Sequence, residues 1–214
     1  MEIVWHGLSC FRFMERGLGS VVTDPYGAES GLPNLKLRAD IVTVSHDEPC
    51  HNNVKAVKST RRIVTGPGEY EIGGVFVTGL SMKPKKGTPK NSPESNTLYV
   101  FDFDGLAVAH LGNLAYVPSQ AQIENLGQVQ IALVPVGGGK SLTPSQASEV
   151  ISMIEPSIVI PMQYHTGKEK PKLGEVTPFL KEMGITNLDP LDSLKVTASG
   201  LSEEMQVILL NPAF

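Results

Sequence analysis

The sequence predicts an α/β (α+β) protein in which β-sheets are covered by helices, and three observations indicate this class. Short β-branched or aromatic runs separated by turns fill the first 110 residues, whereas helical patterns alternate with apolar runs afterwards. The 214 residues also include 21 glycines and 16 prolines, which favour many short elements joined by tight turns. Because no repeat and no linker-like change of composition appears, residues 1–214 are predicted to form a single domain.

The first half is predicted to hold eight strands, each a short run rich in β-branched or aromatic residues. They cover residues 3–5, 10–13, 21–23, 41–44, 63–65, 75–78, 97–101 and 106–109. Asp104-Gly105 between the last two predicts a two-residue hairpin, because glycine accepts a positive φ at little cost. The stretch GPGEYEIGG at 66–74 reads as a turn, a short strand and a second turn. Glu69 and Glu71 share one face of that strand and are expected to face solvent, the alternative being general acid/base groups. Residues 83–95, with three prolines and four lysines, are expected to form a solvated loop, the alternative being a rim for an anionic substrate.

The second half is predicted to alternate helices with buried strands. A capping box at Ser119 and Gln122 opens a helix to about residue 126, and Thr143-Pro144 with Gln146 opens another. The second of these carries an apolar stripe at helical spacing, so one face should pack on a core. The remaining elements are strands at 129–135, 157–161 and 206–210 and a helix at about 176–183.

Charge and hydropathy exclude several classes of function. A net charge of -4 gives no reason to expect nucleic acid or an anionic membrane as the partner. No apolar run approaches the roughly 18–20 residues that span a bilayer, and no signal-peptide pattern opens the chain. Two cysteines, Cys10 and Cys50, do not make a disulfide scaffold. A cytoplasmic protein is therefore expected.

Potential metal ligands gather at 45–53, which reads SHDEPCHNN and follows an apolar strand. Imidazole, carboxylate and thiolate groups all bind zinc, and this loop offers each kind. An extended backbone would put His46, Glu48 and Cys50 on one side, with His51 turned inward at the bend near Pro49. His110 and His165 also follow predicted strands, where α/β proteins gather their sites.

A glycine-rich turn, VGGGKS at 136–141, lies between a predicted strand and a helix start. Such turns can hold phosphate through backbone N–H groups. The nucleotide-binding pattern fails, however, since Val134 stands where its first glycine is needed. An ordinary turn is the favoured interpretation.

Five stretches occur in the order typical of one family. They are MEIVWHGLSCFRF…VVTDPYG, VTVSHDEPCHNN, GPGEYEIGGVFVTG, NTLYVFDFDGLAVAHLGNL and PSIVIPMQYHT. In these the chain resembles the metallo-β-lactamase superfamily, in the branch of small metal-dependent hydrolases related to L-ascorbate-6-phosphate lactonase. The resemblance implies an αββα sandwich of two mixed sheets flanked by helices. It also implies a mono- or dinuclear metal site that activates water for hydrolysis.

The family's metal ligands carry over only in part. In the HxHxDH motif, His46 and His51 match, while Glu48 and Cys50 replace the middle histidine and the aspartate. Outside the motif, the resemblance assigns Asp24 of the Asp-Pro pair to the site, and His110 matches a family histidine. Two further ligands are replaced by Asn113 and Gln163, with His165 two residues beyond the latter.

These replacements leave three alternatives for the site. A dinuclear hydrolase is disfavoured, because an asparagine cannot supply the charge of a bridging carboxylate. One zinc or manganese ion, held by some of His46, Glu48, Cys50, His51 and His110, is the second alternative. The third is a metal-free fold, in a variant of which Cys50 is a nucleophile with a neighbouring histidine as base.

The functional prediction follows from this set. Glu48 and Cys50 are the candidate catalytic residues; His46, His51 and His110 are the candidate ligands; Asp24, Asn113, Gln163 and His165 are candidate pocket residues. An active protein would hydrolyse an unidentified small ester, lactone or phosphoester. The alternative is a non-catalytic binding or scaffold protein that uses the old cleft or a homo-oligomer interface.

Overall fold

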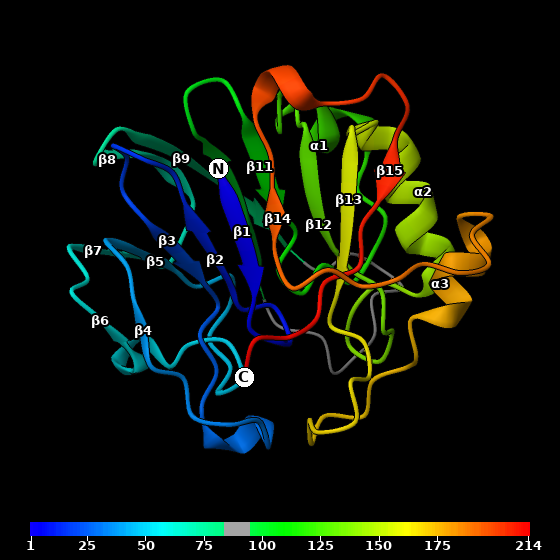
Figure 1. Ribbon diagram of the computed structural model, residues 1–214, viewed down its shortest axis with the longest axis horizontal. Coiled ribbons are helices and arrows are strands. Elements are labelled where there is room, and N and C mark those ends of the chain that lie inside the picture. Colours follow the sequence, from blue (N-terminus) through cyan, green and yellow to red (C-terminus); the bar gives the residue numbers. More distant parts are fainter. Residues whose placement is uncertain (84–94) are drawn as a thin grey trace.

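Two β-sheets face one another in the computed structural model, which describes residues 1–83 and 95–214 (Figure 1). The first sheet has the order β14-β1-β2-β3-β5-β7, and the second β15-β13-β12-β11-β10-β9-β8. The first comprises β1 (Glu2–Trp5), β2 (Phe11–Met14), β3 (Val21–Thr23), β5 (Ile41–Thr43), β7 (Arg62–Val64) and β14 (Leu194–Lys195). The second comprises β8 (Gly68–Ile72), β9 (Val75–Met82), β10 (Asn96–Asp102), β11 (Ala107–His110), β12 (Ile131–Pro135), β13 (Ile158–Met162) and β15 (Gln206–Val207). Both sheets mix parallel and antiparallel pairs, as the resemblance implies.

The six-stranded sheet is buried on both faces. Val21 and Ile41 belong to the core between the sheets, whereas the next residues, Val22 and Val42, belong to a second core with Tyr26. Successive side chains of a strand point to opposite faces, so the outer face needs its own cover. In the described ranges this cover consists of short elements: β4 (Leu37–Arg38), β6 (Val57–Lys58) and the 3₁₀ turns η1 (Ala28–Ser30) and η2 (Val54–Ala56).

Helices cover the seven-stranded sheet. They are α1 (Gln120–Glu124), α2 (Pro144–Ile154) and α3 (Thr177–Glu182), with a 3₁₀ turn η3 (Ala198–Gly200) later in the chain. Figure 1 shows α2 and α3 outside β12, β13 and β15. The predicted capping box of α2 is present: the Gln146 backbone N–H donates to Thr143 Oγ1 at 3.3 Å, and the Thr143 N–H donates to Gln146 Oε1 at 3.0 Å. No helix among residues 1–83 and 95–214 is long and apolar enough to cross a membrane.

Most elements lie where the sequence predicts them. The eight first-half strands are confirmed, although β9 runs on to Met82. The helices predicted to end at about 126 and 183 end at Glu124 and Glu182, and the strand predicted at 206–210 covers only Gln206–Val207. Residues 103–106 close the predicted hairpin: the N–H groups of Phe103 and Leu106 each donate to the other's carbonyl, at 3.1 and 3.3 Å, and Asp104 and Gly105 both have positive φ. Three strands of two residues each, β4, β6 and β14, were too short to predict. Residues 84–94 of the predicted solvated loop lie outside the described part of the chain.

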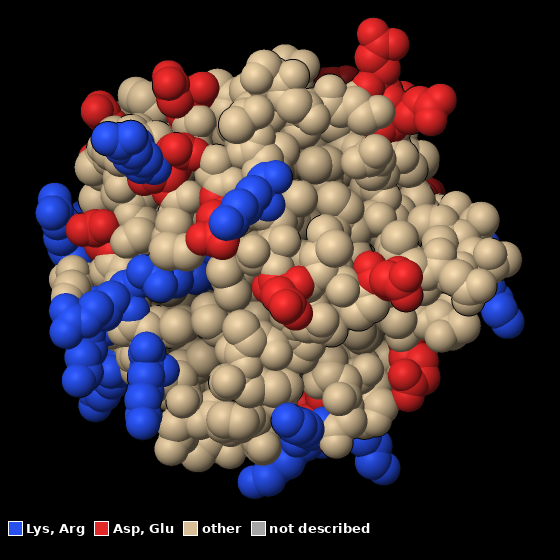
Figure 2. All heavy atoms as spheres, viewed as in Figure 1, with Lys and Arg blue, Asp and Glu red and all other residues tan. Residues whose placement is uncertain are grey.

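Basic side chains gather at one edge of the molecule, over β4, β6 and β7 (Figure 2). Arg38, Lys58, Arg61 and Arg62 are all exposed there. Because β7 is the last strand of its sheet, these charges hinder pairing with the edge of another sheet.

The loops that follow five strands meet at one end of the sandwich. β3 runs parallel to β5, and β11, β12 and β13 run parallel to one another, so each group has its C-terminal ends on one side. The backbones of two of these loops touch: a Cβ on Gly137 would lie 2.0 Å from the carbonyl oxygen of Gln163. A residue with a side chain cannot occupy position 137 without moving the loop after β13. This end carries the candidate site.

Candidate metal centre

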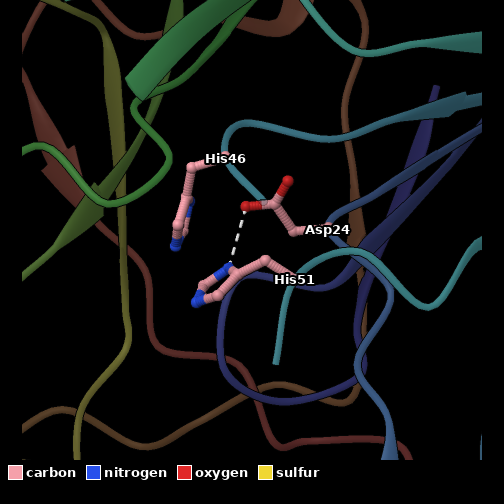
Figure 3. A group of neighbouring side chains, drawn as sticks. All are labelled: Asp24, His46 and His51. Carbon is pink, nitrogen blue, oxygen red and sulfur yellow. Dashed lines mark hydrogen bonds and ion pairs between the residues drawn. The ribbon is translucent and has the colours of Figure 1, made fainter. Parts of the chain in front are cut away.

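Three buried side chains, Asp24, His46 and His51, come together beneath these loops (Figure 3). Asp24 directly follows β3, and the two histidines lie in the loop after β5. One metal-binding atom of each residue lies within 4.8 Å of the corresponding atoms of the other two. The parallel pairing of β3 with β5 therefore joins residues that are more than twenty positions apart in the chain.

Both oxygens of the Asp24 carboxylate take part in hydrogen bonds. Its Oδ1 accepts from the Ser45 backbone N–H at 2.7 Å, and its Oδ2 accepts from Ser45 Oγ at 2.5 Å. Oδ2 also meets His51 Nδ1 at 3.1 Å. Burial opposes the charge, but the hydrogen bond from His51 and the three neighbouring histidines lower the pKa of Asp24 to about 2. Asp24 is thus an ionised acceptor that orients other groups.

These contacts determine the tautomers of both histidines. Since Ser45 gives its one hydroxyl proton to Asp24, it must accept from His46 Nδ1, which lies 2.9 Å away. His51 Nδ1 likewise donates to the carboxylate. Each ring is left with a lone pair on Nε2, the arrangement found where a histidine binds a metal through one nitrogen and is oriented through the other.

The two imidazoles lie side by side, with ring centroids 4.1 Å apart and planes 45° apart. Figure 3 shows their outer nitrogens on the same side, away from Asp24. Burial, followed by the nearby His51, lowers the pKa of His46 to about 4, so this ring is neutral at pH 7. Its Nε2 is buried and has no hydrogen-bond partner within the described ranges. Such an orphaned acceptor is costly unless a ligand uses it.

Glu48 and Lys140 form an ion pair beside this nitrogen. Lys140 Nζ lies 3.0 Å from Glu48 Oε1 and 3.3 Å from Oε2. Glu48 Oε2 lies 3.9 Å from His46 Nε2. A carboxylate is therefore within reach as a third ligand, already paired with a cation.

A cavity of about 420 Å³ opens over the centre. It is lined by Leu8, Glu48, Cys50, His51, Asn113, Gly138, Gly139, Lys140, Gln163, Pro171, Lys172 and Leu173. Of the predicted site residues, Glu48, Cys50, His51, Asn113 and Gln163 reach the cavity, whereas Asp24 and His46 lie beneath it.

His110 lies near this cluster, but its metal-binding atoms are not part of it. The ring is fully buried, and Nε2 donates to the Ser9 carbonyl at 2.9 Å. Burial lowers its pKa, so the ring is neutral, with an unpartnered lone pair on Nδ1 among the described residues. In this arrangement Nε2 of His110 carries a proton and cannot bind a metal.

Gln163 and His165, the two predicted site residues that follow β13, lie in different places. Gln163 is buried with φ +53°, and its side-chain amide donates to Ser9 Oγ. His165 lies at the surface, 41% exposed, with Nδ1 against Glu169, and is not among the residues that line the cavity. It does not take the place of Gln163.

The backbone of the 45–53 loop corrects one expectation. It is not extended: the N–H of Glu48 donates to the His46 carbonyl at 3.1 Å, and the N–H of His51 donates to the Glu48 carbonyl at 2.8 Å. These successive turns, rather than strand alternation, bring His51 beside His46, and the inward turn near Pro49 was predicted correctly. Cys50 is half-buried at the cavity wall.

Sequence reasoning missed two residues of the site, Ser45 and Lys140. Ser45 directly precedes His46, and a hydroxyl next to a strand-end histidine is a usable signal for an orienting partner. Lys140 follows β12 in the glycine-rich turn, so the rule that sites gather at strand ends would have selected it.

Comparison with known proteins agrees with the fold. The family model described as the beta-lactamase superfamily domain matches residues 2–163, about three quarters of the chain. The chain belongs to the metallo-β-lactamase superfamily. It is 27% identical over 191 residues to a UPF0173 metal-dependent hydrolase of Thermoplasma acidophilum, covering 78% of this chain and 84% of that protein. A related protein of Methanoculleus marisnigri is 28% identical over 188 residues, covering 78% and 82%.

A solved structure from Thermotoga maritima, described as a candidate Zn-dependent hydrolase of this superfamily, is also similar. It has a TM-score of 0.79 and 31% identity, covering 98% of this chain and 97% of that one. A candidate metal-dependent hydrolase from Parabacteroides distasonis shares the fold, with a TM-score of 0.64 and 18% identity over 98% and 93% of the chains. The αββα sandwich is therefore the fold of this superfamily member.

Proposed function

We propose that this member of the metallo-β-lactamase superfamily is a hydrolase with a mononuclear centre, which acts weakly on a small ester, lactone or phosphoester. Nε2 of His46 and Nε2 of His51 would hold one zinc or manganese ion, with Glu48 as the third ligand. The observation that carries this proposal is the pair of Nε2 lone pairs, aligned by hydrogen bonds to Ser45 and Asp24. Three protein ligands and an open position are typical of catalytic zinc sites.

A second metal ion does not fit the residues around this centre. Both Asp24 oxygens already accept hydrogen bonds, and His110, whose Nε2 donates to Ser9, could offer only Nδ1, which is not part of the cluster of candidate ligand atoms among the described residues. Asn113 and Gln163, at the other expected positions, are neutral amides and poor metal ligands. These features support the interpretation that the dinuclear site of the family is eroded in this chain.

A bound divalent ion would supply Lewis acidity and activate water for hydrolysis. The chain supplies the rest: Ser45 and Asp24 keep both imidazoles in the ligating tautomer, and the cavity of about 420 Å³ excludes bulk water around a small substrate. Burial, followed by the nearby Glu48 and Glu29, raises the pKa of Cys50. The thiol therefore stays protonated at neutral pH, which does not favour Cys50 as a nucleophile.

A second candidate function is metal-free binding of a small molecule in the same cavity. The observation that favours it is the Lys140–Glu48 pair, because an ammonium already neutralises the carboxylate that a metal would use. The protein would then keep the cavity and lose the hydrolytic chemistry.

Metal content separates the two candidates. Protein purified without a metal-affinity tag is dialysed against zinc or manganese and then against metal-free buffer, and the bound metal is measured by mass spectrometry. The mononuclear proposal expects about one equivalent per chain, lost in His46→Ala and His51→Ala and retained in His165→Ala, whose site lies outside the cavity. A content below about 0.1 equivalent would favour the metal-free function.

A further inference from the structure

The Glu48 carboxylate lies between a cation and the orphaned nitrogen of His46. Lys140 Nζ contacts both carboxylate oxygens, at 3.0 and 3.3 Å, while Glu48 Oε2 is 3.9 Å from His46 Nε2. Lys140 and Glu48 are 92 residues apart in sequence, on the loops after β12 and β5. Their side chains are 46% and 31% exposed. The pair thus joins the two sheets at the mouth of the cavity and can open without unfolding a core.

A metal ion and Lys140 compete for the same carboxylate. An ammonium in contact with both oxygens takes one lone pair of each and neutralises the charge of the carboxylate, which weakens it as a metal ligand. The positive charge of Lys140 would also repel a divalent ion bound a few ångströms away. Because the site is only half-exposed, solvent and salt screen this repulsion only in part. Metal binding therefore requires Lys140 to leave Glu48, and the free energy of that displacement is subtracted from metal affinity.

We propose that Lys140 is a built-in competitor that sets the metal affinity of the His46–His51 centre through Glu48. The inference rests on the proposed function, since it concerns the same centre. With Lys140 on Glu48 the centre has two nitrogen ligands, and with Lys140 displaced it gains a third, anionic ligand. Breaking a half-exposed ion pair and removing the repulsion together correspond to about a tenfold change in dissociation constant.

The test measures zinc binding by isothermal titration calorimetry on chelator-stripped, desalted protein. Lys140→Met should bind zinc about tenfold more tightly than the wild type, and Lys140→Arg, which keeps the charge, should not. Lys172→Met is the matched control: Lys172 lines the same cavity, but the ion pairs of Glu48 in the described ranges are with Lys140 and His46. Thermal melts of each variant without metal check that the fold is kept.

A double-mutant cycle tests whether the effect passes through Glu48. In a Glu48→Gln background, adding Lys140→Met should change the zinc dissociation constant by no more than about threefold, because the contested carboxylate is absent and only the repulsion from the Lys140 charge is removed. A full tenfold effect in that background, or an equal effect of Lys172→Met, would show a general charge effect and overturn the inference.

The remaining outcomes separate this inference from the proposed function. Zinc binding by Lys140→Met alone, with none by the wild type, supports the competitor role in its strongest form. Equal dissociation constants for the wild type and Lys140→Met overturn the inference and leave the mononuclear centre standing. Binding by neither protein overturns the mononuclear centre, and the inference fails with it.

Discussion

At the scale of single residues, Asp24 shows how a buried charge can organise a site. Its carboxylate accepts from the backbone and the hydroxyl of Ser45 and from His51, and Ser45 in turn accepts from His46. Its φ of +40° is one that aspartate tolerates better than most residues. The single carboxylate thus determines that each histidine is oriented through its Nδ1.

We expect Asp24→Asn to lower the free energy of unfolding by about 3 kcal/mol, because a buried network loses its charge and one amide proton points at a donor. Zinc affinity should fall about 10-fold to 100-fold as the imidazoles lose their orientation. Urea denaturation and calorimetry measure the two effects. Asp47→Asn, an exposed acid in the same loop, should change stability by less than about 0.5 kcal/mol. Equal effects of the two substitutions would contradict this role of Asp24.

At the scale of elements, local signals decide most of the turns and helix starts. The hairpin between β10 and β11 forms because Asp104 and Gly105 accept positive φ, at +55° and +85°. α2 begins at Pro144 because Thr143 and Gln146 satisfy each other's backbone N–H groups. These features need only neighbouring residues, so a sequence pattern predicts them.

Gly105→Ala should cost about 1 kcal/mol or somewhat more of unfolding free energy. A Cβ at this position meets no atom within 4 Å, so the cost comes from the backbone conformation alone. Gly66→Ala is the matched control, since it also has open space around it but no positive φ, and it should leave stability unchanged or slightly raised. Chemical denaturation of both variants provides the comparison, and equal midpoints would rule out this explanation.

At the scale of the whole molecule, loops of both sheets enclose the candidate site. The centre takes Asp24, His46 and His51 from loops of the six-stranded sheet, while the cavity above it is completed by loops of the seven-stranded sheet. Folding therefore places a neutral His46 and an ionised Asp24 in buried positions, and this makes the stability of the whole molecule depend on pH.

Stability should fall as the pH decreases from 6.5 towards 4. In the folded protein His46 keeps a pKa of about 4, whereas the unfolded chain takes up this proton near pH 6.5, so acid favours unfolding by on the order of 3 kcal/mol. Asp24 continues the trend: its stabilisation, present above pH 3.8, is lost as the pH falls towards 2.

Urea midpoints in chelator at pH 7.5, 5.5 and 4.5 measure this dependence for the wild type, His46→Gln and His165→Gln. The slope of stability against pH should be shallower in His46→Gln and unchanged in His165→Gln, whose ring is 41% exposed. If His46→Gln keeps the wild-type slope, His46 is not the group that couples protons to folding.

The sequence by itself determined the class of the fold, nearly all the strands, the capped helices, the hairpin and the loop that carries the histidines. Each depends on residues close together in the chain, as with the apolar run before His46 or the pair Asp104-Gly105. The resemblance added the sandwich and the family, which the comparisons confirm.

Only the tertiary structure decided how the candidate ligands are used. In the folded protein Asp24 accepts hydrogen bonds from Ser45 and His51, and His110 donates to the Ser9 carbonyl. Lys140 forms an ion pair with Glu48, and His165 lies outside the cavity. Each of these contacts joins segments brought together by sheet pairing and loop packing. The direction of a ring nitrogen or an ammonium depends on hydrogen-bond partners that can lie 92 or 101 residues away in the chain, and no local pattern contains that information.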